Sequence, residues 1–273
     1  MTFNVWGETR WSERKEALQE CLRISNPDVL VLQEVTPTVL DAIDAALEHH
    51  ARVKPVDTLD EEEGIEGWSC ESHIYYNTKY FTKLEHGLEK VDITDHPHRG
   101  LFWARFGVIG REQQEHGAQT TKPITTFVVS TVHMPWPGCP TEISTGVNQR
   151  VVCAQRVSEA LQTITCHDRN EPLVLGGDFN EAFHPVRVLK ESAAALKDAF
   201  EILDMAPPIT HPVRNTDEHE VHMPDQCLDW IMVRILLHFV IPFFFPSLSL
   251  SIYCPLLAFP DTTRRLTIIP IPQ

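Results

Sequence analysis

Polar side chains follow an apolar run in the second half of the chain. Residues 172–180 read Pro-Leu-Val-Leu-Gly-Gly-Asp-Phe-Asn, which predicts a buried strand that runs into a tight Gly-Gly turn. Side chains two residues apart in an extended segment point the same way, so Asp178 and Asn180 are placed to address one small ligand. A carboxylate beside a neutral amide suits activation of a water or orientation of a phosphate. The alternative is an ordinary polar turn, because Gly, Asp and Asn all favour turns.

Further polar residues stand at the ends of other predicted strands, namely Asn4, Glu34, His133 and Asp229. Ligand sites gather at strand ends in α/β sheets. Together with the first pair, these residues form an oxygen-rich set without clustered thiolates. Such a set favours Mg²⁺ or Mn²⁺ over zinc and suits phosphate chemistry.

A second metal hypothesis uses nitrogen and sulfur ligands. His211, His219, His222 and Cys227 imitate a zinc site, with His219 and His222 close in sequence. Their spacing matches no standard zinc motif, so a polar loop that lines the cleft is the preferred interpretation.

The elements that must position these residues alternate at the start of the chain. A strand over 1–6 precedes a helix over 12–24, for which Ser12 is the predicted N-cap. A strand over 28–34 follows, and Thr36 with Pro37 begins a second helix. This helix carries Leu40, Ile43, Ala46 and Leu47 inward. The alternation indicates a layered α/β fold.

The rest of the chain contains more strand-like segments, which turn-rich stretches separate. They predict strands over 72–76, 99–106, 124–133, 172–177 and 228–233, several with antiparallel neighbours, and helices over 148–166 and 198–203. Arg150 could reach a phosphate, but a surface position at the start of a helix is preferred. Tyr75, Trp103 and Trp136 are expected in the core or at its rim rather than as substrate-stacking residues.

Composition restricts the class of protein. The net charge is −15 over 273 residues, which argues against a broadly basic nucleic-acid-binding surface but leaves a nucleic-acid substrate open. The 7 cysteines form no CxxC pair, and no basic region followed by an apolar run occurs at Met1, so we expect no secretory signal. We therefore expect an intracellular and cytoplasmic protein, with nuclear and membrane-associated locations left open. The oligomeric state is not predicted.

The C-terminal segment 235–273 differs from the body. It begins with a long uncharged stretch that contains Pro242, Pro246 and Pro255, which make a poor continuous helix. We interpret it as a tail outside the fold that arises from a gene-model artefact. A membrane-associated segment and a genuine terminal strand pair are the alternatives.

Short motifs in order along the chain resemble the endonuclease/exonuclease/phosphatase superfamily, which includes pancreatic deoxyribonuclease, abasic-site endonucleases and tyrosyl-DNA phosphodiesterases. They are TFNVW at 2–6, DVLVLQEV at 28–35, TVHM at 131–134, GGDFN at 176–180 and LDWI at 228–231. The resemblance covers residues 1–234 and implies one domain with a four-layer α/β/β/α sandwich of two packed mixed sheets.

The resemblance also implies roles for the candidate residues. Glu34 is similar to the family's metal-binding glutamate, and Asn4 to an asparagine that assists the metal or phosphate. The positions of Asp178 and Asn180 match the pair that orients water and steadies phosphate. His133 resembles the histidine that contacts phosphate or assists the leaving oxygen, with a purely structural strand-end role as its alternative.

The sequence departs from the family after Asp229. The family ends with a further strand and a Ser-Asp-His motif, whose histidine pairs with the aspartate that Asp229 resembles. The later histidine here is His238, which has no acidic neighbour. We therefore expect a sheet without its last strand and an Asp229 without its partner.

These observations give an expected function and its rivals. The first is an Mg²⁺- or Mn²⁺-dependent hydrolase of a phosphodiester or phosphomonoester. The second is an inactive relative that binds metal or phosphate, and the third is a membrane-tethered phosphodiesterase, which depends on the tail. The net charge of −15 disfavours long duplex DNA as substrate.

Overall fold

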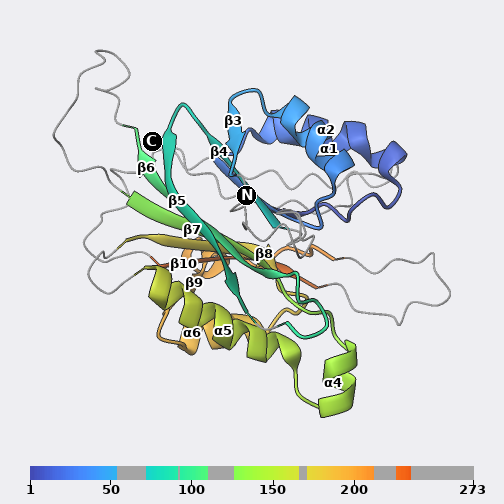
Figure 1. Cartoon of the computed structure of the whole chain (residues 1–273), viewed down its shortest axis with the longest axis vertical. Coiled ribbons are helices and arrows are strands. Elements are labelled where there is room, and N and C mark those ends of the chain that lie inside the picture. The colour runs from blue at the N-terminus through green and yellow to red at the C-terminus, as the bar shows by residue number, and fades with distance from the viewer. Residues whose placement is uncertain (54–71, 92, 110–125, 166–170, 212–225, 235–273) are drawn as a thin grey trace, which may run out of the picture.

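A computed structural model describes residues 1–53, 72–91, 93–109, 126–165, 171–211 and 226–234 (Figure 1). The strands are β1 (Thr2–Asn4), β2 (Val29–Gln33), β3 (His50–Arg52), β4 (Ser72–Asn77), β5 (Phe81–Lys90), β6 (Gly100–Val108), β7 (Thr126–His133), β8 (Leu173–Asp178), β9 (Lys197–Asp198) and β10 (Asp229–Arg234). The helices are α1 (Trp11–Ser25), α2 (Pro37–Ala46), α4 (Pro140–Thr145), α5 (Gln149–Ile164), α6 (His184–Glu191) and α7 (Ala199–Ile202).

The strands form two mixed sheets. The first has the order β1-β2-β4-β3, with β1 parallel to β2 and the other pairs antiparallel. The second has the order β5-β6-β7-β8-β10-β9, with β7 parallel to β8 and the other pairs antiparallel. The two parallel pairs matter for function because they bring the carboxyl ends of neighbouring strands to one edge of each sheet.

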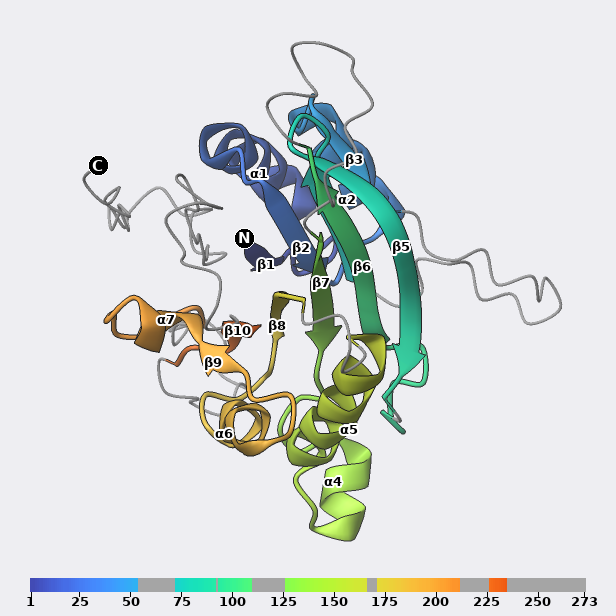
Figure 2. The ribbon, with the colours of Figure 1, turned by 90° about the vertical axis from the view of Figure 1, so that its left-hand side faces the viewer.

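Three apolar clusters hold four layers together (Figures 1 and 2). Helices α1 and α2 cover the outer face of the first sheet, and α5 and α6 cover the outer face of the second. Between the sheets, Val31 and Ile74 pack in one cluster with Phe102 and Phe106. The predicted α/β/β/α sandwich of two mixed sheets is therefore confirmed.

Helix α1 begins differently from the prediction. Ser12 lies inside the helix. The N-cap position is Arg10, which has a left-handed backbone conformation and no side-chain hydrogen bond that caps the helix. The buried Arg14 guanidinium instead donates to the carbonyl oxygens of Val5, at 2.8 Å, and Thr9, at 2.8 Å. These hydrogen bonds fix the loop before the helix, so tertiary contacts replace a local cap. Thr36 and Pro37 do begin α2 as expected.

The Gly-Gly pair does not form the tight turn that its sequence predicts. Gly176 and Gly177 both lie inside β8, paired with β7 and β10. A Cβ on Gly176 would lie 2.7 Å from Val31 Cγ2 of the opposite sheet, and one on Gly177 would collide with the Val132 carbonyl oxygen. Close packing, rather than a turn conformation, explains both glycines.

Several elements were not predicted from the sequence, chiefly β5 and α6. Strand β5 is at the edge of its sheet, mixes exposed and half-buried residues, and has an irregularity between Lys83 and Glu85, so its polar alternation is interrupted. Helix α6 has its Pro185 near the first position and buries Val186 and Leu189 over only two turns. Both are weak signals by periodicity alone.

The tail hypotheses and the predicted absence of a last strand concern residues after Arg234, which lie outside the described residues. In the part that the structure describes, no helix has the length and apolar character needed to cross a membrane.

A buried histidine in β4 predicts how stability depends on pH. His73 is 1% exposed, and within the described residues neither ring nitrogen has a hydrogen-bond partner. Burial, together with the charge of Arg52, lowers the pKa of His73 from 6.5 to about 3. Below pH 6.5 the unfolded chain gains a proton that the folded chain does not bind, so stability falls as the pH decreases toward 3.

Lowering the pH from 7.5 to 4.5 should therefore cost the wild type about 2–3 kcal/mol more of unfolding free energy than it costs His73→Leu. Urea unfolding at the two pH values measures this difference. The exposed His49 supplies the control, since His49→Gln should keep the wild-type dependence. An identical pH dependence in His73→Leu would contradict the prediction.

Candidate metal-binding and catalytic site

The predicted polar strand ends meet at one place. Asn4 ends β1 and Glu34 follows β2, at adjacent carboxyl ends of the first sheet. In the second sheet, Asp178 at the end of β8 lies between His133 of β7 and Asp229, which begins the antiparallel strand β10. Asn4 Nδ2 joins the two sheets, because it donates to Glu34 Oε1 at 2.8 Å and to Asp178 Oδ2 at 2.8 Å.

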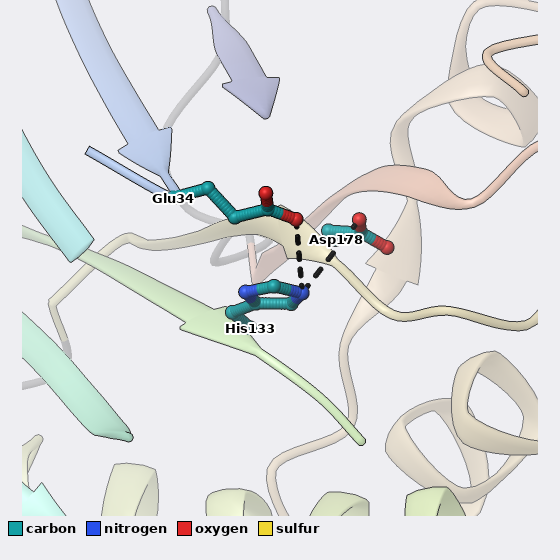
Figure 3. Close-up of side chains that lie close together, drawn as sticks. All are labelled: Glu34, His133 and Asp178. Carbon is teal, nitrogen blue, oxygen red and sulfur yellow. Dashed lines mark ion pairs between the residues drawn. The ribbon is translucent and has the colours of Figure 1, made fainter. Parts of the chain in front are cut away.

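Glu34, His133 and Asp178 form a compact cluster (Figure 3). His133 Nε2 lies 3.8 Å from Glu34 Oε1 and 3.9 Å from Asp178 Oδ2. One candidate ligand atom from each residue lies within 4.8 Å of the others. The Glu34 side chain is 31% exposed, whereas that of His133 is 3% exposed, so the cluster opens to solvent on the Glu34 side.

Asn4 holds the carboxylates as a hydrogen-bond donor. The Trp6 backbone N–H donates to Asn4 Oδ1 at 2.8 Å, which assigns the oxygen to that side of the amide. The Nδ2 hydrogens therefore face Glu34 and Asp178. In this arrangement Asn4 positions two carboxylates, while its assignment as a direct metal ligand stays a prediction.

Asp178 and Asn180 are linked, but not as neighbours on one strand face. Strand β8 ends at Asp178, and Asn180 has φ 52°, so the rule for extended segments does not apply to it. The Asn180 N–H instead donates to Asp178 Oδ1 at 2.8 Å, and its Nδ2 donates to the Met134 carbonyl oxygen at 2.9 Å. The backbone turn brings the two side chains to the same site by a different route from the one predicted.

Glu34 shares this left-handed backbone, with φ 55°. The conformation is uncommon for residues other than glycine and asparagine and costs about 1–2 kcal/mol. The Glu34 carbonyl oxygen accepts a hydrogen bond from the Gly7 N–H at 3.1 Å, which helps to hold it. Backbone strain of this kind concentrates at functional sites.

Asp229 is a buried carboxyl group beside this cluster. It is 4% exposed, and among the described residues its Oδ1 has no hydrogen-bond partner. Burial first, and then the charge of Asp178, raise the pKa of Asp229 well above its usual value, although a hydrogen bond with Thr210 acts in the opposite sense. Burial and the neighbouring carboxylates thus disfavour the ionised form of Asp229. The later histidine, His238, lies outside the described residues.

The charges of the cluster fit a divalent cation. Among the described residues, no Lys or Arg pairs with Glu34 or Asp178, and His133 Nε2 lies 3.8 Å and 3.9 Å from their oxygens. Carboxylates held this close repel one another unless a cation lies between them. Two carboxylates and one imidazole suit a metal such as Mn²⁺ or, with several retained waters, Mg²⁺.

The expected surface position of Arg150 is wrong. Arg150 is 3% exposed, because its Nε donates to Glu181 at 2.7 Å and its Nη2 donates to Glu142 at 2.9 Å. These two glutamates were not predicted as partners of Arg150. The sequence feature that could have indicated them is Asn148, a typical N-cap residue, whose side chain caps α5 and also donates to Glu181 at 2.9 Å.

The three aromatic residues lie where the sequence predicts, and part of the zinc set lies outside the described residues. Tyr75 and Trp103 are buried and Trp136 is 42% exposed, as expected for core and rim positions. His219 and His222 lie outside the described residues. Cys227 is a buried thiol that contacts the Asp229 carbonyl oxygen at 3.2 Å, and burial raises its pKa, which disfavours a thiolate ligand.

Comparisons with known proteins agree with this fold. The model of the "Endonuclease/Exonuclease/phosphatase family" matches residues 1–234. No curated protein sequence matches the chain.

Several solved structures are similar to the chain. TDP2 of D. rerio, complexed with a single-strand DNA product, has a TM-score of 0.61 and 16% identity, and the match covers 85% of this chain and 82% of that one. The human Nocturnin catalytic domain with bound sulfate has a TM-score of 0.55 and 18% identity, over 82% of this chain and 75% of that one. A mannosyl-6-phosphatase of Bacteroides thetaiotaomicron has a TM-score of 0.55 and 18% identity, over 82% and 77%. At these identities the similarity shows the fold.

Proposed function

Because the chain belongs to the endonuclease/exonuclease/phosphatase family, we propose that it hydrolyses a phosphate ester with Mg²⁺ or Mn²⁺. Family members are hydrolases of phosphate esters and generally use divalent metals. The observation that carries the proposal is the cluster of Glu34, His133 and Asp178, with one ligand atom from each within 4.8 Å of the others.

In this proposal Glu34 is the main metal ligand, and Asp178 Oδ2 lies close enough to contribute. Asn4 keeps both carboxylates in place through its Nδ2 hydrogens. When bound, the cation supplies charge neutralisation and polarisation at the phosphoryl group.

The remaining residues handle the water and the phosphate. Asp178 accepts a hydrogen bond from the attacking water, orients it and takes its proton at a carboxylate oxygen. Asn180 steadies a phosphate oxygen with the Nδ2 hydrogen that does not face Met134. His133 is not a metal ligand in this proposal, because its Nε2 donates a hydrogen bond to a phosphate oxygen or to the leaving oxygen.

The alternative is a relative that binds metal or phosphate without turnover. It is favoured by Asp229, whose Oδ1 has no hydrogen-bond partner in the described part of the chain. The resemblance implies a histidine partner for this carboxyl group, and within the described residues its Oδ1 stays without a hydrogen bond although Thr210 contacts the group.

Turnover and metal binding separate the two functions. We propose to measure Mg²⁺ and Mn²⁺ binding by calorimetry, and hydrolysis of bis(p-nitrophenyl) phosphate and p-nitrophenyl phosphate, on the full chain. The hydrolase should bind metal and turn over one of these esters, and Glu34→Gln should weaken metal binding about 10- to 100-fold because it removes one ligand charge.

The matched control is Glu16→Gln, at an exposed position on α1. It makes the same chemical change and should alter neither metal binding nor turnover. Metal binding without hydrolysis of either ester would favour the inactive relative. No metal binding by the wild type would contradict the proposed site.

A further inference from the structure

A partly buried ionic cluster, centred on the buried Arg150, lies next to the proposed site. Arg150, at the start of α5, contacts two carboxylates: its Nε lies 2.7 Å from Glu181 Oε2, and its Nη1 lies 2.8 Å from Glu142 Oε2. Glu181 also accepts hydrogen bonds from Asn148 Nδ2 at 2.9 Å and from the His184 N–H at 3.2 Å. We call these residues, Glu142, Asn148, Arg150, Glu181 and His184, the Arg150 cluster.

The Arg150 cluster joins segments that are distant in sequence. Glu142 belongs to α4, Asn148 and Arg150 to the start of α5, and Glu181 to the loop between β8 and α6. The cluster therefore fastens the loop after β8 to the start of a helix in the outer layer (Figure 2).

The fastened loop carries the proposed catalytic residues. Glu181 directly follows Asn180, which has φ 52° and whose N–H donates to Asp178 Oδ1 at 2.8 Å. Asparagine adopts the left-handed conformation more readily than most residues, so the hydrogen bonds on either side of Asn180 determine where its side chain is held. On one side Asn180 is held by the Met134 carbonyl oxygen, and on the other the next residue is held by Arg150.

Both carboxylates of the cluster are ionised in the folded protein. Burial opposes this, but hydrogen bonds from Asn148, Arg150 and His184 outweigh it and lower the pKa of Glu181 to about 2. Hydrogen bonding and the charge of Arg150 likewise outweigh burial and lower the pKa of Glu142. Partly buried charge-assisted bonds of this kind are strong and directional.

We propose that Arg150 is a positioning residue that, through Glu181, holds Asn180 in its left-handed conformation beside Asp178. The inference rests on the proposed function, in which Asn180 steadies the phosphate. The two contacts of Arg150 then have different roles. The contact with Glu181 positions the site, while the contact with Glu142 anchors α4.

The two contacts give a matched experiment. Glu181→Gln and Glu142→Gln each replace one carboxylate that contacts the Arg150 guanidinium by a neutral amide. A purely structural role of Arg150 therefore predicts similar losses of stability and activity in both variants. For a positioning role, Glu181→Gln should lower kcat for the ester that the wild type hydrolyses about 10- to 100-fold with KM changed less than about threefold. Glu142→Gln should lower kcat less than about threefold.

A second measurement does not depend on turnover. Hydrogen exchange followed by mass spectrometry on peptides that cover 178–184 should be at least about tenfold faster in Glu181→Gln than in the wild type. The same peptides should be unchanged in Glu142→Gln. Urea unfolding of both variants shows that they fold and compares their stability.

The outcomes separate the two proposals. Equal kcat losses in both variants, or unchanged exchange at 178–184 in Glu181→Gln, would overturn the positioning role. If the wild type hydrolyses no ester, the proposed hydrolase function fails, and the exchange comparison alone decides the role of Arg150. A selective effect in Glu181→Gln supports it in either case.

Discussion

Replacing Asp178 by asparagine should lower kcat of the proposed phosphoesterase about 10²- to 10⁴-fold, the range typical of removing a general base. Asparagine has nearly the same shape and can still accept one hydrogen bond, so the packing at the end of β8 is kept. It loses the charge, however, and therefore cannot take a proton from water or attract a cation. Steady-state hydrolysis of bis(p-nitrophenyl) phosphate with saturating Mg²⁺ measures the effect.

Hydrogen bonds explain why substitution of Asp178 should lower kcat more than substitution of its neighbours. Each of its oxygens accepts one hydrogen bond, from the Asn180 N–H at Oδ1 and from Asn4 Nδ2 at Oδ2. The carboxylate is thus fixed at the junction of the two sheets. Asp41→Asn, at an exposed position on α2, makes the same chemical change away from the site and should leave kcat unaltered. A folded Asp178→Asn protein with kcat within tenfold of the wild type would refute the assignment.

Part of the site could be predicted because strand order constrains it. The parallel pairs β1–β2 and β7–β8 place Asn4 beside Glu34 and His133 beside Asp178, since parallel strands end at a common edge. Asp229 joins them from the start of the antiparallel strand β10. Their meeting across two sheets required the family resemblance as well, because no local pattern tells which sheets face each other.

Other features could not be predicted from local signals. The left-handed conformations of Glu34 and Asn180 arise from tertiary hydrogen bonds, not from residue preference alone. Arginine is usually a surface residue, and the burial of Arg150 depends on two glutamates, one of them distant in sequence. A buried charge becomes predictable only when its partners are known.

The glycine pair shows the same limit, because Gly-Gly predicts a turn from the sequence, whereas in the structure it meets a packing requirement within β8. Substitution of Gly177 should therefore cause a large loss of stability. Gly177→Ala should lower the free energy of unfolding by at least about 3 kcal/mol, since the new methyl group would collide with the Val132 backbone of β7. A backbone carbonyl between two paired strands cannot move aside as a flexible side chain can. Urea unfolding followed by circular dichroism measures the loss.

Gly138→Ala is the matched control for this substitution. Gly138 has φ +76°, and a Cβ there would meet nothing within 4 Å, so the alanine should cost only the roughly 1–2 kcal/mol of a left-handed residue. Because Gly177 lies opposite Trp230 of β10 and directly precedes Asp178, a shift of β8 would also separate the catalytic carboxylate from Asn4. Any folded Gly177→Ala protein should therefore have lost metal binding as well as stability. A loss below about 1 kcal/mol would mean that β7 and β8 can separate without cost, contrary to the close approach that excludes a side chain at this position.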